Sequence, residues 1–152
     1  MRPGEHLLHG RKVEVDIDPD PADEAKVFAG LRAFNERIAG PANEVRVSVF
    51  VRDGVHRVLG GLVGVVKYRW LHIDLLWLPE PLRGRGMGST LVHLAEKEAV
   101  ARGCIGAHVE TTDYQALPFY EKLGYEVFGT LEGYPPGSRA YYLGKRLADG
   151  DA

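Results

Sequence analysis

"LWLPEPLRGRGMGSTLVHLAEKEA", residues 76–99, joins an apolar run to a long helical pattern through a turn that holds three glycines and two arginines. The segment "WLHIDLLWLP" (70–79) predicts a strand ended by proline, and apolar spacing predicts a helix from about Ser89 to Arg102. Glycine is costly inside a helix and adds nothing to a core. Three of them at this junction therefore need an explanation of their own.

An anion site explains the glycines. The first N–H groups of a helix lack intrahelical partners and carry partial positive charge, so they attract anions. Glycine lets several of these amides approach one phosphate without a Cβ in the way. Arg83 and Arg85 would add positive charge at the rim. A simple tight turn is the alternative, but the position between a strand and a helix favours the anion site.

Other phosphate-binding loops fit this segment less well. A Walker A loop needs a lysine after its last glycine, where this chain has Ser89. A dinucleotide fingerprint needs glycine or alanine at the same position and a turn directly after the strand, whereas "PEPLR" intervenes here. Glu110 ends the next predicted strand, where a ribose-binding acid could stand, so the dinucleotide alternative stays open.

Length and composition predict one globular domain over residues 1–152, with 45% apolar and 26% charged residues. A net charge of −2 disfavours nucleic acid as a partner. No apolar run approaches the ~20 residues that span a bilayer, so no membrane association is expected. One cysteine allows neither an internal disulfide nor a CxxC zinc site. A cytoplasmic location and the absence of a metal are expected.

The order of the elements predicts an α/β fold with a mixed sheet and helices packed on it. Asp113 is the expected N-cap of the third helix, and Asp53-Gly54 indicates a hairpin. Strands are predicted over 12–19, 43–54, 56–69, 70–79, 104–111, 125–129 and 140–147, and helices over 20–41, 89–102 and 113–125.

Two motifs resemble the GCN5-related N-acetyltransferase (GNAT) family. "RGRGMG" (83–88) fits the family's R/Q-x-x-G-x-G/A signature, and "ALPFYEKLGYEVFG" (116–129) looks like its A-x-x-x-Y-x-x-x-G-F/Y segment. The element order matches as well. The resemblance covers about residues 11–147 and implies a single N-acetyltransferase domain with a GNAT-like mixed, mostly antiparallel twisted sheet flanked by helices. It also implies acetyl-CoA as co-substrate.

The resemblance assigns cofactor contacts to the strand and the loop. Loop amides and Arg83 would hold the pyrophosphate, and the backbone of two strand residues would pair with the pantetheine arm. The residues implied are Leu76, Leu78, Arg83, Arg85, Gly86, Met87, Gly88 and Ser89. One position departs from the family: Asp113 stands where the family often carries an Asn that contacts the cofactor.

The resemblance also assigns the chemistry, a direct transfer in which an amine attacks the thioester. Tyr120 matches the tyrosine that supplies a proton to the leaving thiolate, a task that suits a phenol with an ordinary pKa of ~10 beside a thiol of ~8.5. It lies on an apolar helix face, so a purely structural role is the alternative. Asp74 and His72 are the expected bases, because strand alternation puts them on one face with Leu76 and Leu78. Glu110 is a weaker alternative.

In this family the acceptor site lies between the first helix and the late hairpin loop. The candidates on those elements and beside Asp74 are Trp70, Tyr134, Leu31 and Asn35. Together these inferences predict an N-acetyltransferase acting on a primary amine of a small molecule such as an amino acid, polyamine, antibiotic or other metabolite. A protein acetyltransferase, a non-catalytic CoA-binding module and a nucleotide-binding redox protein are the alternatives. A homodimer is possible by resemblance.

Overall fold

The computed structural model describes residues 3–147 and divides into two compact units, Met1–Pro41 and Ala42–Ala152. In the first unit, β1 (Glu5–Leu8) and β2 (Arg11–Glu14) form an antiparallel hairpin, followed by α1 (Pro21–Ala39). Asp20 caps α1 by accepting a hydrogen bond from the Ala22 N–H at 2.9 Å, and Pro21 occupies the first helical position.

The predicted first strand, 12–19, is too long. The strand β2 ends at Glu14. Beyond it the Asp16 carboxylate accepts a hydrogen bond from the Asp18 N–H at 3.1 Å, which bends the chain before the helix. Its partner β1 carries little alternating pattern and was not predicted.

The second unit holds a six-stranded sheet in the order β3-β4-β5-β6-β8-β7. Only the β5–β6 pair is parallel, so the sheet is mixed and mostly antiparallel, as predicted. The elements are β3 (Val45–Arg52), β4 (Val58–Lys67), β5 (Trp70–Trp77), the 3-10 turn η1 (Glu80–Leu82), α2 (Met87–Ala101), β6 (Gly106–Thr112), α3 (Leu117–Lys122), β7 (Glu126–Glu132) and β8 (Arg139–Arg146).

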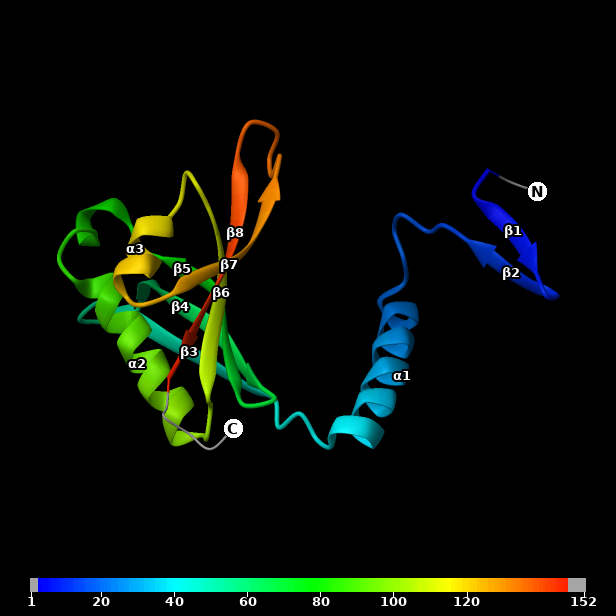
Figure 1. Cartoon of the computed structure of the whole chain (residues 1–152), viewed down its shortest axis with the longest axis horizontal. Helices are drawn as coiled ribbons and strands as arrows, with labels where there is room; N and C mark the ends of the chain where they lie inside the picture. Colours follow the sequence, from blue (N-terminus) through cyan, green and yellow to red (C-terminus); the bar gives the residue numbers. More distant parts are fainter. Residues whose placement is uncertain (1–2, 148–152) are drawn as a thin grey trace. The chain divides into compact units, whose positions relative to one another are not determined.

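Helices α2 and α3 lie against the same face of this sheet, and the core is formed there (Figure 1). One face of α2 packs on β3, β4 and β5. Buried side chains of the strands and of α2 meet in this layer; they include Leu62, Leu71, Ile73, Leu91, Val92, Ala95 and Leu143. Alternation along β3 and β4 supplies part of this apolar face, as the sequence pattern indicated.

The predicted N-cap role of Asp113 is wrong. Helix α3 begins later, at Leu117, with Pro118 in its first turn, where the missing N–H costs no hydrogen bond. The carboxylate of Asp113 accepts a hydrogen bond from the Arg139 N–H at 3.3 Å instead, and so ties the end of β6 to the start of β8.

One buried polar cluster fastens α2 to the far strands of the sheet. Glu96, 7% exposed, accepts a hydrogen bond from the Tyr125 hydroxyl at 2.9 Å and forms an ion pair with Lys145 at 2.9 Å. Burial, and then the Glu96 charge, raise the pKa of Tyr125 far above its ordinary value, so the phenol stays a donor. Removing the carboxylate would leave an ammonium and a hydroxyl without their partner.

We expect Glu96→Ala to lower the free energy of unfolding by about 2–3 kcal/mol, because it breaks a largely buried ion pair. Glu98→Ala is the matched control on the same helix: Glu98 pairs with Arg102 near the surface, so the loss should stay below about 0.5 kcal/mol. Urea denaturation followed by circular dichroism measures both. Equal losses in the two variants would contradict the role given to the buried cluster.

Candidate active site

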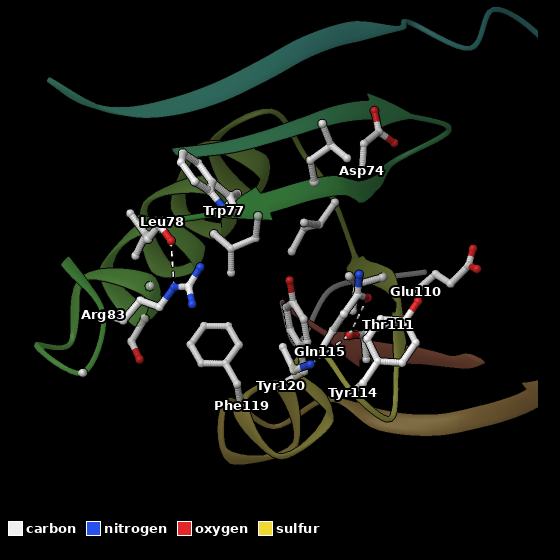
Figure 2. Close-up of a pocket in the computed structure, with 18 of the residues that line it drawn as sticks. Asp74, Trp77, Leu78, Arg83, Glu110, Thr111, Tyr114, Gln115, Phe119 and Tyr120 are labelled. Atoms are coloured by element: carbon white, nitrogen blue, oxygen red, sulfur yellow. Dashed lines mark hydrogen bonds between the residues drawn. The ribbon is translucent and has the colours of Figure 1, made fainter. Parts of the chain in front are cut away.

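The main cleft lies where two neighbouring strands separate. Strands β5 and β6 are paired from Trp70↔Gly106 to Ile73↔Val109 and then diverge. A cleft of about 770 Å³ opens beyond that point, between the ends of both strands, the glycine loop and α3 (Figure 2). A sheet that loses its ladder in this way exposes backbone groups and side chains of both strands to a ligand.

A β-bulge at Asp74 changes the faces of β5. In the pairing with β4, Ile73 lies opposite Gly64 and Leu75 opposite Val63, so Asp74 has no partner. Leu71 and Ile73 are buried before the bulge, and Leu76 and Leu78 continue that face after it. The prediction that His72, Asp74, Leu76 and Leu78 share one face is therefore wrong, because strict alternation does not survive an inserted residue.

The two predicted bases contact each other directly. The Nδ1 atom of His72 lies 2.9 Å from Oδ1 of Asp74, and both side chains are partly exposed. The ring of His108 stacks on His72 with 4.4 Å between centroids and 4° between planes. Burial, and then the neighbouring His72, lower the pKa of His108. Asp74 and Glu110 line the cleft, whereas His72 does not.

The glycine loop meets three different demands. Gly84 and Gly86 have φ angles of +74° and +77°, in the left-handed region that glycine adopts without strain. Gly88 lies in the first turn of α2, where a Cβ would stand 3.2 Å from the Phe119 ring. No side chain caps α2, and its first intrahelical bond runs from the Thr90 N–H to the Gly86 carbonyl. The preceding amides can therefore receive an anion at this helix start.

Arg83 combines a structural contact with a place in the cleft. Its Nε donates to the Leu78 carbonyl at 2.8 Å, which holds the guanidinium at the end of β5 (Figure 2). In this view Arg83 lies at one end of the cleft, and Asp74 and Glu110 lie at the other. The cleft thus has a positive end near the start of α2 and a negative end at the bulge.

Tyr120 stands between these ends. The residue is 3% exposed, and its ring makes edge contacts with Phe119 at 5.0 Å and Tyr125 at 5.7 Å. Its hydroxyl points into the cleft in Figure 2, and no hydrogen bond joins it to another residue of the described range 3–147. Burial raises the pKa of Tyr120 to about 12, which keeps the phenol protonated at neutral pH.

Most of the predicted cofactor residues line the cleft, but none of the predicted acceptor residues does. Trp70 lies with His108 in a second hollow, Tyr134 is half-exposed in the β7–β8 loop, and Leu31 and Asn35 lie on α1 in the first unit. Arg85 and Met87 belong to the loop and the start of α2 but do not line the cleft. The predicted catalytic and cofactor residues that line the cleft are Asp74, Leu76, Leu78, Arg83, Gly86, Gly88, Ser89 and Tyr120.

Sequence reasoning missed the polar turn between β6 and α3. Thr111, Tyr114 and Gln115 line the cleft, and so does Phe119 beside Gly88. The signal was their position, directly between the strand end and the tyrosine motif. Among residues 3–147 no group of three or more His, Cys, Asp or Glu is placed to hold a metal, and no helix there is long and apolar enough to span a membrane.

Comparison with known proteins assigns the family. The model of the acetyltransferase (GNAT) family matches residues 14–125. A structure from Agrobacterium tumefaciens assigned as an acetyltransferase is 33% identical with a TM-score of 0.83, covering 87% of this chain and 96% of that one. The chain therefore belongs to the GNAT family, which confirms the predicted family, fold class and enzyme class.

Two further relatives are informative. Blasticidin-S acetyltransferase from Streptomyces morookaense is 48% identical over 89 residues, 58% of this chain and 65% of that protein, so the match spans less than two thirds of it. An aminoglycoside 6'-N-acetyltransferase solved with coenzyme A has a TM-score of 0.61 at 20% identity, covering 90% of this chain and 97% of that one, a likeness of fold.

The buried phenol gives a direct spectroscopic prediction. Because its folded pKa is raised above the ordinary value of 10, Tyr120 stabilises the fold below pH 10, and this contribution is lost as pH rises towards 12. Between pH 9 and 11 the native protein and Tyr120→Phe should therefore show the same rise in absorbance at 295 nm. A smaller rise in Tyr120→Phe than in the native protein would show that Tyr120 titrates as an ordinary phenol, whereas Tyr125, whose pKa is raised far above its ordinary value, contributes to neither rise.

Proposed function

We propose that this protein transfers the acetyl group of acetyl-CoA directly to a primary amine of a small molecule. The observation that carries the proposal is the polarity of the cleft. A helix start suited to phosphate lies at one end, carboxylates suited to an ammonium lie at the other, and a protonated phenol faces the space between them.

The loop fits the pyrophosphate of acetyl-CoA. The amides of Arg85, Gly86, Met87, Gly88 and Ser89 would receive it, with Arg83 beside them. Apart from the glycine and its two chain neighbours, no residue comes within 4 Å of the place where a Cβ would stand on Gly84 or Gly86, so a phosphate can come close to the backbone there. The backbone of Leu76 and Leu78 would hold the pantetheine arm, since β5 has lost its β6 partner at that point.

The reaction itself needs two proton movements. The amine must lose a proton before its nitrogen attacks the thioester carbon; the N–C bond then forms and the C–S bond breaks. Asp74 would accept the ammonium proton, directly or through water. Tyr120 would donate its proton to the leaving thiolate, and a phenol kept protonated by burial suits that donation.

His72 would act together with Asp74 as one unit. The 2.9 Å contact places the Nδ1–H of a neutral His72 on the carboxylate, which leaves Nε2 as the basic nitrogen. Since the His72 side chain is 41% exposed, its Nε2 could accept the amine proton through a water and later release it to solvent, while Asp74 keeps accepting the Nδ1–H hydrogen bond. Either group, or a water between them and the amine, could be the immediate base.

The acceptor is proposed as a small molecule, and blasticidin S is the first to test because of the relative that acetylates it. Trp70, Tyr134, Leu31 and Asn35 are retained as proposed acceptor contacts. Homodimer formation and a cytoplasmic location are further proposals.

The deciding assay incubates the protein with acetyl-CoA and a panel of amines that includes blasticidin S, and follows thiol release. Release that needs no amine, or no release with any amine, would reject the function.

Binding of the co-substrate can be tested separately by thermal denaturation. Acetyl-CoA and CoA at ~100 times their Kd should stabilise the fold by about 2.7 kcal/mol, whereas NADH should not. Gly86→Val should abolish the shift, because a branched side chain at φ +77° strains the loop and shields its amides. Gly137→Val, at φ +89° in the distant β7–β8 loop, is the control for strain alone and should keep the shift. Loss of binding in both variants would contradict the loop assignment.

The two catalytic roles predict different losses. Tyr120→Phe keeps the ring and removes only the hydroxyl, so kcat should fall by about 10²-fold or more with little change in the Kd of CoA. Asp74→Asn should lower kcat at neutral pH and lose less as the pH is raised, since more of the acceptor then arrives as the free amine. Tyr114→Phe serves as the control for loss of a tyrosine hydroxyl in the cleft. A Tyr120→Phe variant with full kcat would leave Tyr120 a core residue only.

A further inference from the structure

The side chain of Gln115 is held in one orientation by the turn between β6 and α3. Its Oε1 accepts a hydrogen bond from the Thr112 N–H at 3.2 Å and lies 3.5 Å from the Thr111 hydroxyl oxygen. That hydroxyl accepts a hydrogen bond from the Ala116 N–H at 3.2 Å, and the Gln115 N–H donates to the Thr112 carbonyl at 3.1 Å. Backbone and side chain of this turn are thus tied together.

These contacts decide which way the carboxamide faces. A backbone N–H can only donate, so the atom that it meets must be the amide oxygen and not the nitrogen. The NH₂ group then points the other way, and none of the hydrogen bonds formed within the described residues uses it. Gln115 lines the main cleft, and in Figure 2 it lies on the Glu110 side of Tyr120, away from Arg83.

We propose that Gln115 is a binding residue whose NH₂ group donates a hydrogen bond to an oxygen of the molecule that occupies the cleft beside Tyr120. The proposal rests on the function proposed above. Asp74 and Glu110, when ionised, can only accept hydrogen bonds, so Gln115 supplies a neutral donor at this end of the cleft. A ligand with a carbonyl or hydroxyl oxygen near the reacting atoms satisfies it; a plain alkylamine does not.

Two molecules could bring such an oxygen to this place. One is acetyl-CoA, whose pantetheine arm carries amide carbonyls. The other is the acceptor, if a carbonyl or hydroxyl stands close to its amine. In the second case Gln115 would select against simple polyamines, because a bound polyamine would leave the NH₂ group without a partner.

The experiment uses two variants of the full-length protein. Gln115→Glu keeps an oxygen for the Thr112 N–H but presents no donor to the cleft at neutral pH. Gln115→Met has similar length, no charge and no donor. Calorimetric titration gives the Kd of CoA and of acetyl-CoA, and steady-state assays give KM and kcat for blasticidin S or for whichever amine of the panel the native protein acetylates. Melting curves confirm that both variants fold.

We expect both variants to raise one of these constants by about tenfold, the effect of losing one hydrogen bond to a ligand. A higher Kd for CoA identifies the pantetheine arm, and a higher acceptor KM at unchanged Kd identifies the acceptor. Constants within twofold of native in both variants overturn the proposal, as does an effect confined to Gln115→Glu, which would report added charge. If the native protein acetylates no amine, the proposed function fails; the CoA titration then decides alone, and an unchanged Kd overturns the role of Gln115.

Discussion

The cleft depends on the early end of one strand pairing. Parallel β5 and β6 share only four paired positions, from Trp70 to Ile73, and the bulge at Asp74 falls at the point where they separate. An unpaired backbone must find other partners, and here it borders a cleft in which a ligand can supply them. The bulge also sends Asp74 and His72 to one side while Leu76 and Leu78 return to the side of the core. One inserted residue thus changes which side of β5 faces the core, while Asp74, Leu76 and Leu78 all line the cleft.

The second constraint is the approach of α2 to α3. The α2 start must point its free amides at the cleft, and Phe119 of α3 must close against it. Gly88 permits that approach, while Gly84 and Gly86 turn the chain into the helix. The three glycines therefore meet geometric demands of the fold in addition to the proposed anion binding, which a reading of "RGRGMG" as a phosphate loop alone does not capture. Arg83 likewise serves twice, as a brace on the Leu78 carbonyl and as the positive group of the cleft.

The sequence predicted what local patterns determine. Alternation located the strands of the second unit and helical spacing located α1 and α2, because these follow from which side chains must be buried. Prediction from the sequence failed where one inserted residue shifts the alternation of a strand, and where a tertiary contact replaces the expected local one. Nothing in "HIDLL" marks Asp74 as a bulge, and nothing local tells Asp113 to meet Arg139 across the sheet rather than cap α3. Gln115 was missed for a similar reason: the role proposed for it depends on Thr111 and Thr112, which fix its carboxamide, and not on a motif of its own.

The role proposed for Tyr120 shows why core and chemistry need not be alternative explanations of one residue. Its ring belongs to the buried cluster and is fixed by Phe119 and Tyr125, so substitution affects packing. The same burial disfavours the phenolate and raises the pKa of the hydroxyl to about 12, and this ensures that a proton is present to be donated. Tyr125 is buried in the same way, but its hydroxyl donates a hydrogen bond to Glu96 in the core. What separates the two tyrosines is therefore the direction of the hydroxyl: one meets a carboxylate that anchors α2, and the other meets the space where a thiolate would leave.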